Sequence, residues 1–395
     1  MTLRLYDARR GGLYPFAPIG DQPRVGLYVC GVTPYDTGHL GHAFTYVSFD
    51  VLHRYLEYLG YDVEYVQNLT DVDDDMLRKA RETGEDYLAL GNRHVTTFLT
   101  EMAALNWLPP DHYPRATQHI PEMLTLIRKL VAKGLAYAAE GNVYFSVAAD
   151  PGYGQLSKLS REEMLPLANE RGNIPDMPGK RDPLDFVLWQ RSLPDEPAWE
   201  SPWGPGRPGW HIECSAMSMA YLGTRFELHG GGADLLFPHH ESELAQSEGA
   251  TGHRPFVGWW AHVGMLSYEG DKMSKSLGNL VLVSRLREQG VDPMAVRLAI
   301  LAHHYREDWE WTDAGLEHAV ARLERWRTAL SGNGGPDATS TIEAIRTALA
   351  DDLDAPAALR AVDTWADAAL SVGGDDDGAP GLVARALDAL VGVRI

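Results

Sequence analysis

Residues 24–70 place the strongest constraint on how this 395-residue chain folds. Residues 25–30 form a short apolar run, a turn rich in Gly, Thr and Pro follows at 31–38, and residues 39–58 carry apolar side chains at helical spacing. Residues 63–69 form a second apolar run of strand length. A strand, a helix and a strand of these lengths make a βαβ unit. The segment therefore predicts an α/β fold with a Rossmann-type parallel sheet.

Composition narrows the class of protein. Hydrophobic residues make up 45% and charged residues 23%, as in ordinary globular domains. Because no apolar run reaches roughly 18 residues, we expect a cytoplasmic protein with no membrane partner. A formal net charge of −20 disfavours non-specific binding of nucleic acid, which needs Lys and Arg to neutralise phosphates. The two cysteines cannot form a disulfide framework, which leaves metal binding, catalysis or burial as their roles.

Changes in composition along the chain predict four parts. The middle of the chain is rich in Pro and Gly, which indicates an insertion with long surface loops. After a linker at 331–336, the tail contains alanine-rich helical stretches at 342–350 and 355–370. The predicted parts are a Rossmann-type nucleotide-binding catalytic domain at 1–110 and 205–290, a connective insertion at 111–204, a helical stem at 291–330, and a small C-terminal helical bundle at 337–395.

A His-Leu-Gly-His motif at residues 39–42 follows the first predicted strand. His39 and His42 would lie in the first turn of the predicted helix, beside free backbone N–H groups and the positive end of the helix dipole. Such a helix start can bind phosphate, and Gly41 would let a nucleotide base approach the backbone. Two surface histidines at a helix start would give the same pattern, so the motif alone leaves both interpretations open.

A Lys-Met-Ser-Lys-Ser motif occupies residues 272–276. A loop that carries Lys272, Lys275 and two hydroxyl groups can stabilise the charge that develops on a phosphoryl group under attack. A solvated basic loop is the other interpretation of these residues.

Together, in this order and far apart, the two motifs resemble the two signatures of class I aminoacyl-tRNA synthetases. The resemblance implies that ATP, accompanied by Mg²⁺, lies between the motifs. It also implies that a substrate carboxylate attacks the α-phosphate, which gives an acyl-adenylate and pyrophosphate. The side chains expected to stabilise that phosphate are His39, His42, Lys272 and Lys275.

Two cysteines and a histidine form a third group of interest. Cys30 ends the first predicted strand, and Cys214 and His239 lie in later motifs. On a helix, His239 and Glu243 would share one face. Two thiolates, an imidazole and an optional carboxylate are the ligands of a tetrahedral zinc site. A cysteine taken alone is more often a buried apolar residue than a ligand, and a role for Glu243 as a ligand stays open.

Residues 1–330 resemble cysteinyl-tRNA synthetases. The resemblance rests on four stretches, at 28–33, 68–74, 207–214 and 229–235. It implies one zinc ion per chain, bound by Cys30, Cys214 and His239. Zinc would bind the thiol of a cysteine substrate as thiolate, and this metal–sulfur bond would favour cysteine over serine. His240 and Glu241 are expected to support the site from outside the ligand set.

Other stretches resemble the mycothiol ligases, which pass activated cysteine to the amine of glucosaminyl-inositol instead of to a tRNA hydroxyl. These stretches lie at 33–36, 170–175, 304–311 and 390–393. The 65-residue tail from residue 331 has eleven acidic residues, four arginines and no lysine. Its net charge of −7 should repel RNA.

Two other functions remain open. The stretch at 241–247, which contains Glu243, resembles the tRNA enzymes, so a cysteinyl-tRNA synthetase is the alternative. A non-catalytic regulator is a third possibility, which the two intact motifs disfavour.

We therefore expect a ligase that activates L-cysteine with ATP, forms AMP and pyrophosphate, and couples cysteine to glucosaminyl-inositol. We expect it to bind no nucleic acid and to be a monomer or a weak dimer. The resemblance to the ligases implies that the cysteinyl-adenylate contacts Cys30, Gly31, Val32, Thr33, Thr45, Asn68, Leu69, Thr70, Trp210, Gly232, Ala233, Asp234 and Leu266.

Overall fold

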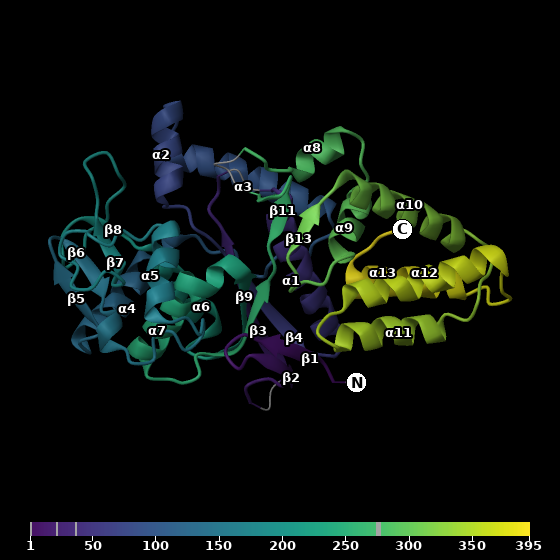
Figure 1. Ribbon diagram of the computed structural model, residues 1–395, viewed down its shortest axis with the longest axis horizontal. Helices are drawn as coiled ribbons and strands as arrows, with labels where there is room; N and C mark the ends of the chain where they lie inside the picture. The colour runs from purple at the N-terminus through teal and green to yellow at the C-terminus, as the bar shows by residue number, and fades with distance from the viewer. Residues whose placement is uncertain (1, 21–22, 36–37, 274–277) are drawn as a thin grey trace.

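A four-stranded parallel sheet forms the centre of the molecule. The computed structural model describes residues 2–20, 23–35, 38–273 and 278–395. The strand order is β10-β9-β3-β4, and every neighbouring pair is parallel (Figure 1). The strands are β3 (Arg24–Val32), β4 (Asp62–Leu69), β9 (Phe226–Gly232) and β10 (Val257–Val263). The predicted α/β fold of the Rossmann type is confirmed.

The side chains of β3 alternate between the two faces of this sheet. Two helices cover these faces, namely α1 (Leu40–Tyr58) and α6 (Trp210–Leu222). Leu27 and Val29 belong to the hydrophobic cluster that contains α1, whereas Tyr28 and Cys30 belong to the cluster that contains α6. A strand buried on both faces needs apolar residues at successive positions, which explains the continuous apolar run in the sequence.

The βαβ unit forms close to where the sequence predicts it. The predicted helix at 39–58 is α1, with His39 as its N-cap, and the predicted strand at 63–69 is β4. The predicted turn at 31–38 begins later than expected, because β3 continues through Val32, which pairs with Leu69 of β4. The carboxyl ends of β3, β4 and β9 therefore lie at the same edge of the sheet.

Between β4 and β9 the chain leaves the central sheet and forms a second, antiparallel sheet of strand order β5-β6-β7-β8. This region therefore contains more regular structure than its Pro and Gly content predicts. The four-part division of the chain stays a prediction, and β8 lies just past the predicted boundary at 204. The elements are α2 (Asp74–Thr83), α3 (Tyr87–Ala104), η1 (Ala116–Gln118), α4 (Ile120–Ala132), β5 (Ala136–Ala139), β6 (Asn142–Phe145), η2 (Val147–Ala149), α5 (Arg161–Glu170), β7 (Phe186–Arg191) and β8 (Gly206–Pro208).

After β9 the chain passes through short helices back to the central sheet and then into a small sheet of order β12-β11-β13. A hairpin of β1 (Arg4–Asp7) and β2 (Gly12–Pro15) opens the chain. The later elements are η3 (Ala233–Leu235), η4 (Leu236–His240), α7 (Glu241–Thr251), β11 (Leu266–Tyr268), β12 (Asp271–Lys272), α8 (Val283–Glu288), α9 (Pro293–Leu301), β13 (Trp309–Trp311) and α10 (Asp313–Leu330).

Three helices end the chain and pack beside α10 and α1 (Figure 1). They are α11 (Thr339–Ala350), α12 (Ala355–Ser371) and α13 (Ala379–Val391). The first two match the predicted helical stretches. The third lies within the predicted bundle at 337–395, and its Pro380 occupies the first turn, where proline is tolerated.

The C-terminal helices share one hydrophobic cluster with α1, and polar contacts reinforce the packing. Arg54 of α1 donates to the carbonyl of Asp388 at 2.9 Å. Arg297 of α9 is fully buried and donates to the carbonyls of Val391 and Leu105. Among the helices of the described residues, none is both long enough and apolar enough to cross a membrane.

Candidate functional site

Four buried donor side chains meet beside the carboxyl end of β3. The sulfurs of Cys30 and Cys214, a ring nitrogen of His239 and a carboxylate oxygen of Glu243 all lie within 4.8 Å of one another. None of the four residues is more than 4% exposed. The three residues predicted as zinc ligands thus come together in space, and Glu243 completes a set of four. We call these four residues the donor cluster.

Separate elements deliver the members of the donor cluster. Cys30 lies near the end of β3, on the face that α6 covers, and Cys214 lies in the second turn of α6. His239 belongs to η4, which runs directly into α7, where Glu243 lies in the first turn. The spacing of four residues places both side chains on one helical face, as the sequence predicts.

The donor atoms are spaced like the ligands of one metal ion. The sulfurs of Cys30 and Cys214 are 3.8 Å apart, and Cys30 Sγ lies 3.5 Å from Glu243 Oε1. Nε2 of His239 lies 3.0 Å from the same oxygen. Zinc bonds of about 2.3 Å to sulfur and about 2.0–2.1 Å to nitrogen or oxygen place tetrahedral ligands roughly 3.3–3.8 Å apart. The observed spacings lie near this range.

Charge is unevenly distributed within the donor cluster. Burial and the hydrogen bond to Cys214 raise the pKa of Cys30. Burial also raises the pKa of Cys214, but the hydrogen bond from Cys30 and the charge of His239 lower it to about 6. Burial lowers the pKa of His239, whereas Glu243 and Cys214 raise it to about 10. A protonated His239 therefore lies between two anions.

This donor set fits a thiophilic metal cation. Nε2 of His239 makes no hydrogen bond among the described residues, although Glu243 Oε1 lies 3.0 Å away. A cation that takes the place of the proton on His239 would meet two sulfurs, one nitrogen and one oxygen, which is a common ligand set for divalent zinc. The donor cluster could therefore hold a metal ion.

Four other histidines surround the donor cluster. Three of them, His229, His211 and His262, were not predicted as site residues. His229 Nε2 lies 2.9 Å from Glu243 Oε2, and His240 Nε2 lies 3.3 Å from Cys30 Sγ. Nδ1 of His211 lies 2.9 Å from Nδ1 of His239. His262 completes the group, with Nε2 2.8 Å from Nδ1 of His240. Such contacts orient ligand side chains and set their basicity.

The position of His240 and Glu241 outside the ligand set stays a prediction. Cys30, His229, His240 and Glu243 form a second group whose donor atoms all lie within 4.8 Å of one another. His240 contacts the sulfur of Cys30, while the carboxylate of Glu241 accepts hydrogen bonds from the backbone N–H groups of Leu156 and Ser157. Glu241 thereby ties the start of α7 to the insertion. His229 could have been found from its place beside the Gly-Gly-Gly stretch at 230–232, two positions after the buried Glu227.

Seven of the residues predicted to contact an adenylate lie at or just after the carboxyl ends of β3 and β4. The backbone N–H of Gly31 donates to Asn68 Oδ1 at 2.8 Å, and Thr70 N–H donates to the carbonyl of Val32. A Cβ on Gly31 would lie 1.5 Å from the carbonyl oxygen of Asn68, so only glycine fits there. The predicted residues that follow β3 and β4 are thus side by side. Those brought together are Cys30, Gly31, Val32, Thr33, Asn68, Leu69 and Thr70.

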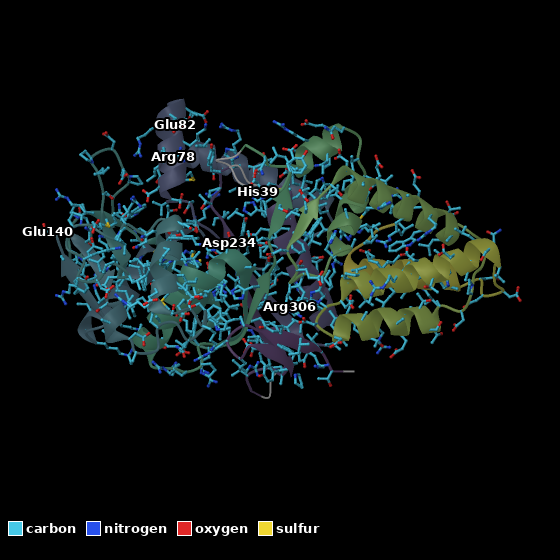
Figure 2. All side chains as sticks on the ribbon, in the orientation of Figure 1. His39, Arg78, Glu82, Glu140, Asp234 and Arg306 are labelled. Atoms are coloured by element: carbon cyan, nitrogen blue, oxygen red, sulfur yellow. The ribbon has the colours of Figure 1, made fainter. Side chains whose placement is uncertain are left out.

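The turn after β9 carries Gly232, Ala233 and Asp234, also predicted to contact the adenylate. Arg171 of the insertion donates to the backbone carbonyls of Asp234 and Phe237, and so holds this turn. In Figure 2, Asp234 and His39 both lie over the middle of the molecule, between the insertion on the left and the C-terminal helices on the right.

Asn68 and Trp210, two predicted contact residues, both touch the donor cluster, and Asn68 Oδ1 lies 3.6 Å from the sulfur of Cys214. Trp210 begins α6, and its ring stacks on His239 with centroids 4.2 Å apart. Thr45 lies on α1 and donates to the carbonyl of Gly41, while Leu266 is buried in β11, where it pairs with Trp309.

The His-Leu-Gly-His motif lies at the start of α1, as predicted. Nδ1 of His39 accepts a hydrogen bond from the N–H of Gly41, so this residue caps the helix. The ring of His39 stacks on that of His42 with centroids 3.9 Å apart. Of the basic motif, Lys272 ends β12, whereas Lys275 lies outside the described residues.

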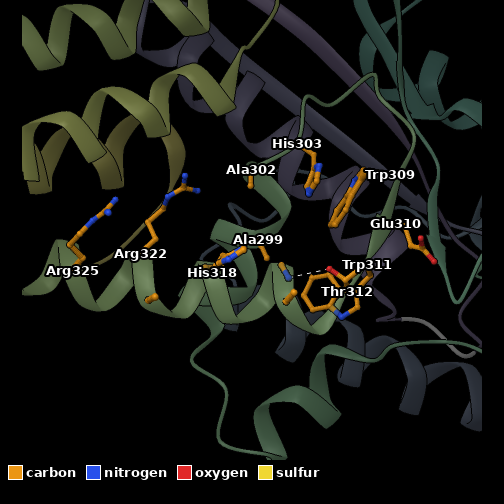
Figure 3. Close-up of a pocket in the computed structure, with 14 residues that line it drawn as sticks. Ala299, Ala302, His303, Trp309, Glu310, Trp311, Thr312, His318, Arg322 and Arg325 are labelled. Atoms are coloured by element: carbon orange, nitrogen blue, oxygen red, sulfur yellow. Dashed lines mark hydrogen bonds between the residues drawn. The ribbon is translucent and has the colours of Figure 1, made fainter. Parts of the chain in front are cut away.

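A separate cavity lies away from these residues (Figure 3). It measures about 730 Å³ and is enclosed by α9, β13 and α10. His303 stacks on Trp309 at its wall, and Arg322 and Arg325 at one side bind Asp363. None of the predicted site residues lines it. The geometry therefore places the candidate site at the sheet edge and not in this cavity. Nε2 of His304 lies 3.1 Å from the backbone carbonyl oxygen of Asp352.

Comparison with known proteins defines the class first. Residues 16–321 match the family described as tRNA synthetases class I (C) catalytic domain. A solved structure, Mycobacterium tuberculosis methionyl-tRNA synthetase in complex with methionyl-adenylate, superimposes with a TM-score of 0.68. The superposition covers 93% of this chain and 91% of the synthetase chain. Because the two sequences are only 17% identical, this likeness is evidence for the fold alone.

Curated relatives are far more similar in sequence. A protein of Nocardiopsis dassonvillei named L-cysteine:1D-myo-inositol 2-amino-2-deoxy-alpha-D-glucopyranoside ligase is 52% identical over 100% of this chain and 96% of its own length. A protein of the same name from Thermomonospora curvata is 50% identical over 100% of this chain and 95% of its own. The chain belongs to this ligase family, within the class I synthetase fold.

Proposed function

We propose that this protein is an ATP-dependent ligase that joins L-cysteine to the amine of glucosaminyl-inositol and forms AMP and pyrophosphate. The observation that carries the proposal is the full-length identity of about half to relatives named for this activity. The class I catalytic domain supports a first step in which the cysteine carboxylate attacks the α-phosphate of ATP. That step gives cysteinyl-adenylate and releases pyrophosphate.

The first step relies on the start of α1 and on the basic motif. His39 and His42, beside the first N–H groups of α1, bind the phosphates of ATP, which carries Mg²⁺. Lys272 and Lys275 stabilise the charge that develops on the α-phosphate. The position of His39 at the N-cap of α1 supports this assignment.

Cysteine is selected at the donor cluster. Cys30, Cys214 and His239 would hold one zinc ion, and Glu243 would lie beside them as a further carboxylate donor. When bound, zinc supplies a Lewis acid that takes up the substrate thiol as thiolate. Trp210, stacked on His239, closes one side of the cysteine pocket, while the residues at the ends of β3, β4 and β9 bind the adenylate. Burial of the donors supports a dry site where such contacts are strong.

In the second step the amine of glucosaminyl-inositol attacks the carbonyl carbon of the adenylate. The C–N bond forms, the C–O bond to AMP breaks with its electron pair going to the phosphate, and the amine gives up one proton. The amino sugar approaches from residues 170–175 of the insertion. The contact of Arg171 with the carbonyl of Asp234 supports this approach, because it places that segment against the adenylate-binding turn.

We propose that no nucleic acid takes part and that the enzyme acts as a monomer or a weak dimer in the cytoplasm. The tail is acidic, and two of its four arginines, Arg346 and Arg394, lie within ion-pair distance of Glu343 and Asp388. The reaction needs ATP and a reduced thiol, which supports a cytoplasmic location.

The test is AMP formation by the purified protein supplied with cysteine and ATP. We expect AMP and an amide product to accumulate when glucosaminyl-inositol is added, with little effect of moderate salt because few phosphate contacts are made. Cysteine tRNA in place of the amino sugar should remain uncharged. Salt-sensitive charging of the tRNA, with no amide product, would identify a cysteinyl-tRNA synthetase instead.

A further inference from the structure

The segment that follows the basic motif returns to the His-Leu-Gly-His motif. Leu282 pairs with His39 in an antiparallel bridge. The N–H of Leu40 donates to the carbonyl of Val281 at 2.9 Å, and the N–H of Val283 donates to the carbonyl of Gly38 at 3.1 Å. Residues 281–283 are therefore fixed against residues 38–40 by backbone contacts. We call this pairing the motif joint.

Glu101 of α3 lies against both sides of the motif joint. It is 2% exposed. Its Oε1 accepts a hydrogen bond of 2.9 Å from the backbone N–H of Ser284, in the first turn of α8. A Cβ on Gly38 would lie 1.5 Å from Glu101 Oε2, so the carboxylate occupies the space that any larger residue at 38 would need.

The carboxylate of Glu101 is not explained by burial alone. Oε2 is buried and makes no hydrogen bond among the described residues. Burial raises the pKa of Glu101, and the hydrogen bonds from Ser284 and the charge of Arg287 only partly oppose this effect. A buried polar atom without hydrogen-bond partners lowers the stability of the folded state. An acidic side chain at this position therefore calls for a role other than packing. An apolar side chain would fill the same volume without that cost.

We propose that Glu101 is a positioning residue that holds the motif joint, and so sets the distance between the histidines at the start of α1 and the basic motif while ATP is attacked. It bonds the segment that follows the basic motif and contacts the residue just before His39. The role rests on the proposed function, because it concerns the adenylation step. Glu101 acts through other residues and does not touch the substrate.

The test measures cysteine-dependent exchange of pyrophosphate into ATP. Glu101→Leu should lower kcat about 10- to 100-fold, the scale of a misplacement near 1 Å, and leave the KM for cysteine and the zinc content unchanged. Glu101→Gln keeps an oxygen that accepts from Ser284 and should retain kcat within about threefold. Glu101→Asp keeps the charge but is one methylene shorter, so its kcat should fall between that of the unmodified protein and that of Glu101→Leu. This variant also covers the case in which Glu101→Leu does not fold.

A double-mutant cycle separates positioning from a structural role. If Glu101 acts through the basic motif, the double variant Glu101→Leu/Lys275→Ala should have a kcat less than about threefold below that of Lys275→Ala alone. Unchanged kcat in both Glu101→Leu and Glu101→Asp would overturn the proposal. So would full additivity with Lys275→Ala, or equal losses of zinc, cysteine affinity and kcat. Absence of exchange in the unmodified protein would overturn the proposed function, and this proposal with it.

Discussion

The donor cluster and the motif joint are built in different ways. The donor cluster consists of side chains that are at most 4% exposed and that already lie at ligand distances from one another. The motif joint holds its two segments through backbone hydrogen bonds and one buried carboxylate. Selection of cysteine therefore depends on a prebuilt centre, whereas phosphate chemistry depends on how two distant motifs are held together.

This difference separates two kinds of failure. Damage to the donor cluster should remove the metal and, with it, recognition of cysteine. Damage to the motif joint should slow adenylation while the metal and cysteine binding persist. The predictions below test whether the two regions can be separated in this way.

The largest effect is expected for Cys214→Ser. Loss of a thiolate should release zinc and abolish exchange by roughly three decades or more, because a bound metal supplies several kcal/mol of charge stabilisation. Zinc analysis and pyrophosphate exchange measure the two losses. Ser218→Ala, one turn further along α6 and also buried, is the matched control and should retain both. Full zinc content in a double variant with Cys30→Ser would refute the assignment of the ligands.

The next largest effect is expected for Lys275→Ala. Exchange should slow by about two to three decades, the scale of losing one partner of the transition-state charge, while zinc content stays unchanged. The exposed Lys129 of α4 offers a control, and Lys129→Ala should have no effect. An unchanged exchange rate in Lys275→Ala would mean that the basic motif does not act on the phosphates.

Glu243→Gln should have a smaller effect on catalysis than on metal binding. We expect zinc affinity to fall roughly 10- to 100-fold, because Glu243 also contacts His229 and His239. Exchange by the zinc-loaded variant should fall less, since the substrate thiolate takes the place of this carboxylate. The measurement is exchange at saturating zinc, alongside a competition titration with a chelator. A loss as severe as that of Cys214→Ser would show that Glu243 stays bound to the metal throughout.

The smallest effect is expected for Trp210→Ala. The stack on His239 resembles aromatic pairs that contribute about 0.5–1.5 kcal/mol, so the KM for cysteine should rise roughly two- to tenfold. The KM for ATP and the zinc content should not change. Steady-state kinetics with each substrate varied in turn measure this, and an equal rise in both KM values would place Trp210 outside the cysteine pocket.

The sequence predicts the parts of the fold that depend on local pattern. The apolar run of β3, the helical spacing of α1 and the helix-start position of His39 all follow from residues close in the chain. The helix α13 lies within the predicted bundle at 337–395, although the alanine-rich stretches that predict the bundle end at residue 370. The antiparallel sheet of the insertion is missed because its strands are short and separated by turns.

The sequence predicts only part of the candidate site, because its residues come from distant parts of the chain. Cys30, Cys214 and His239 are far apart in the chain, and they were found through motifs instead of through spacing. The contacts of His229, His211 and His262 with the donor cluster need the sheet to place them. A histidine within a buried strand gives no sign of which partner it faces until the neighbouring helix is in place.

The most direct test of the prebuilt donor cluster is X-ray absorption at the zinc edge of the holoenzyme, with and without L-cysteine. The account predicts a first shell with two sulfurs and two lighter atoms in the free enzyme, at about 2.3 Å and about 2.0–2.1 Å, and three sulfurs once cysteine is bound. Serine should leave the shell unchanged. A shell that keeps two sulfurs in the presence of saturating cysteine would contradict selection of the substrate by direct metal–thiolate binding.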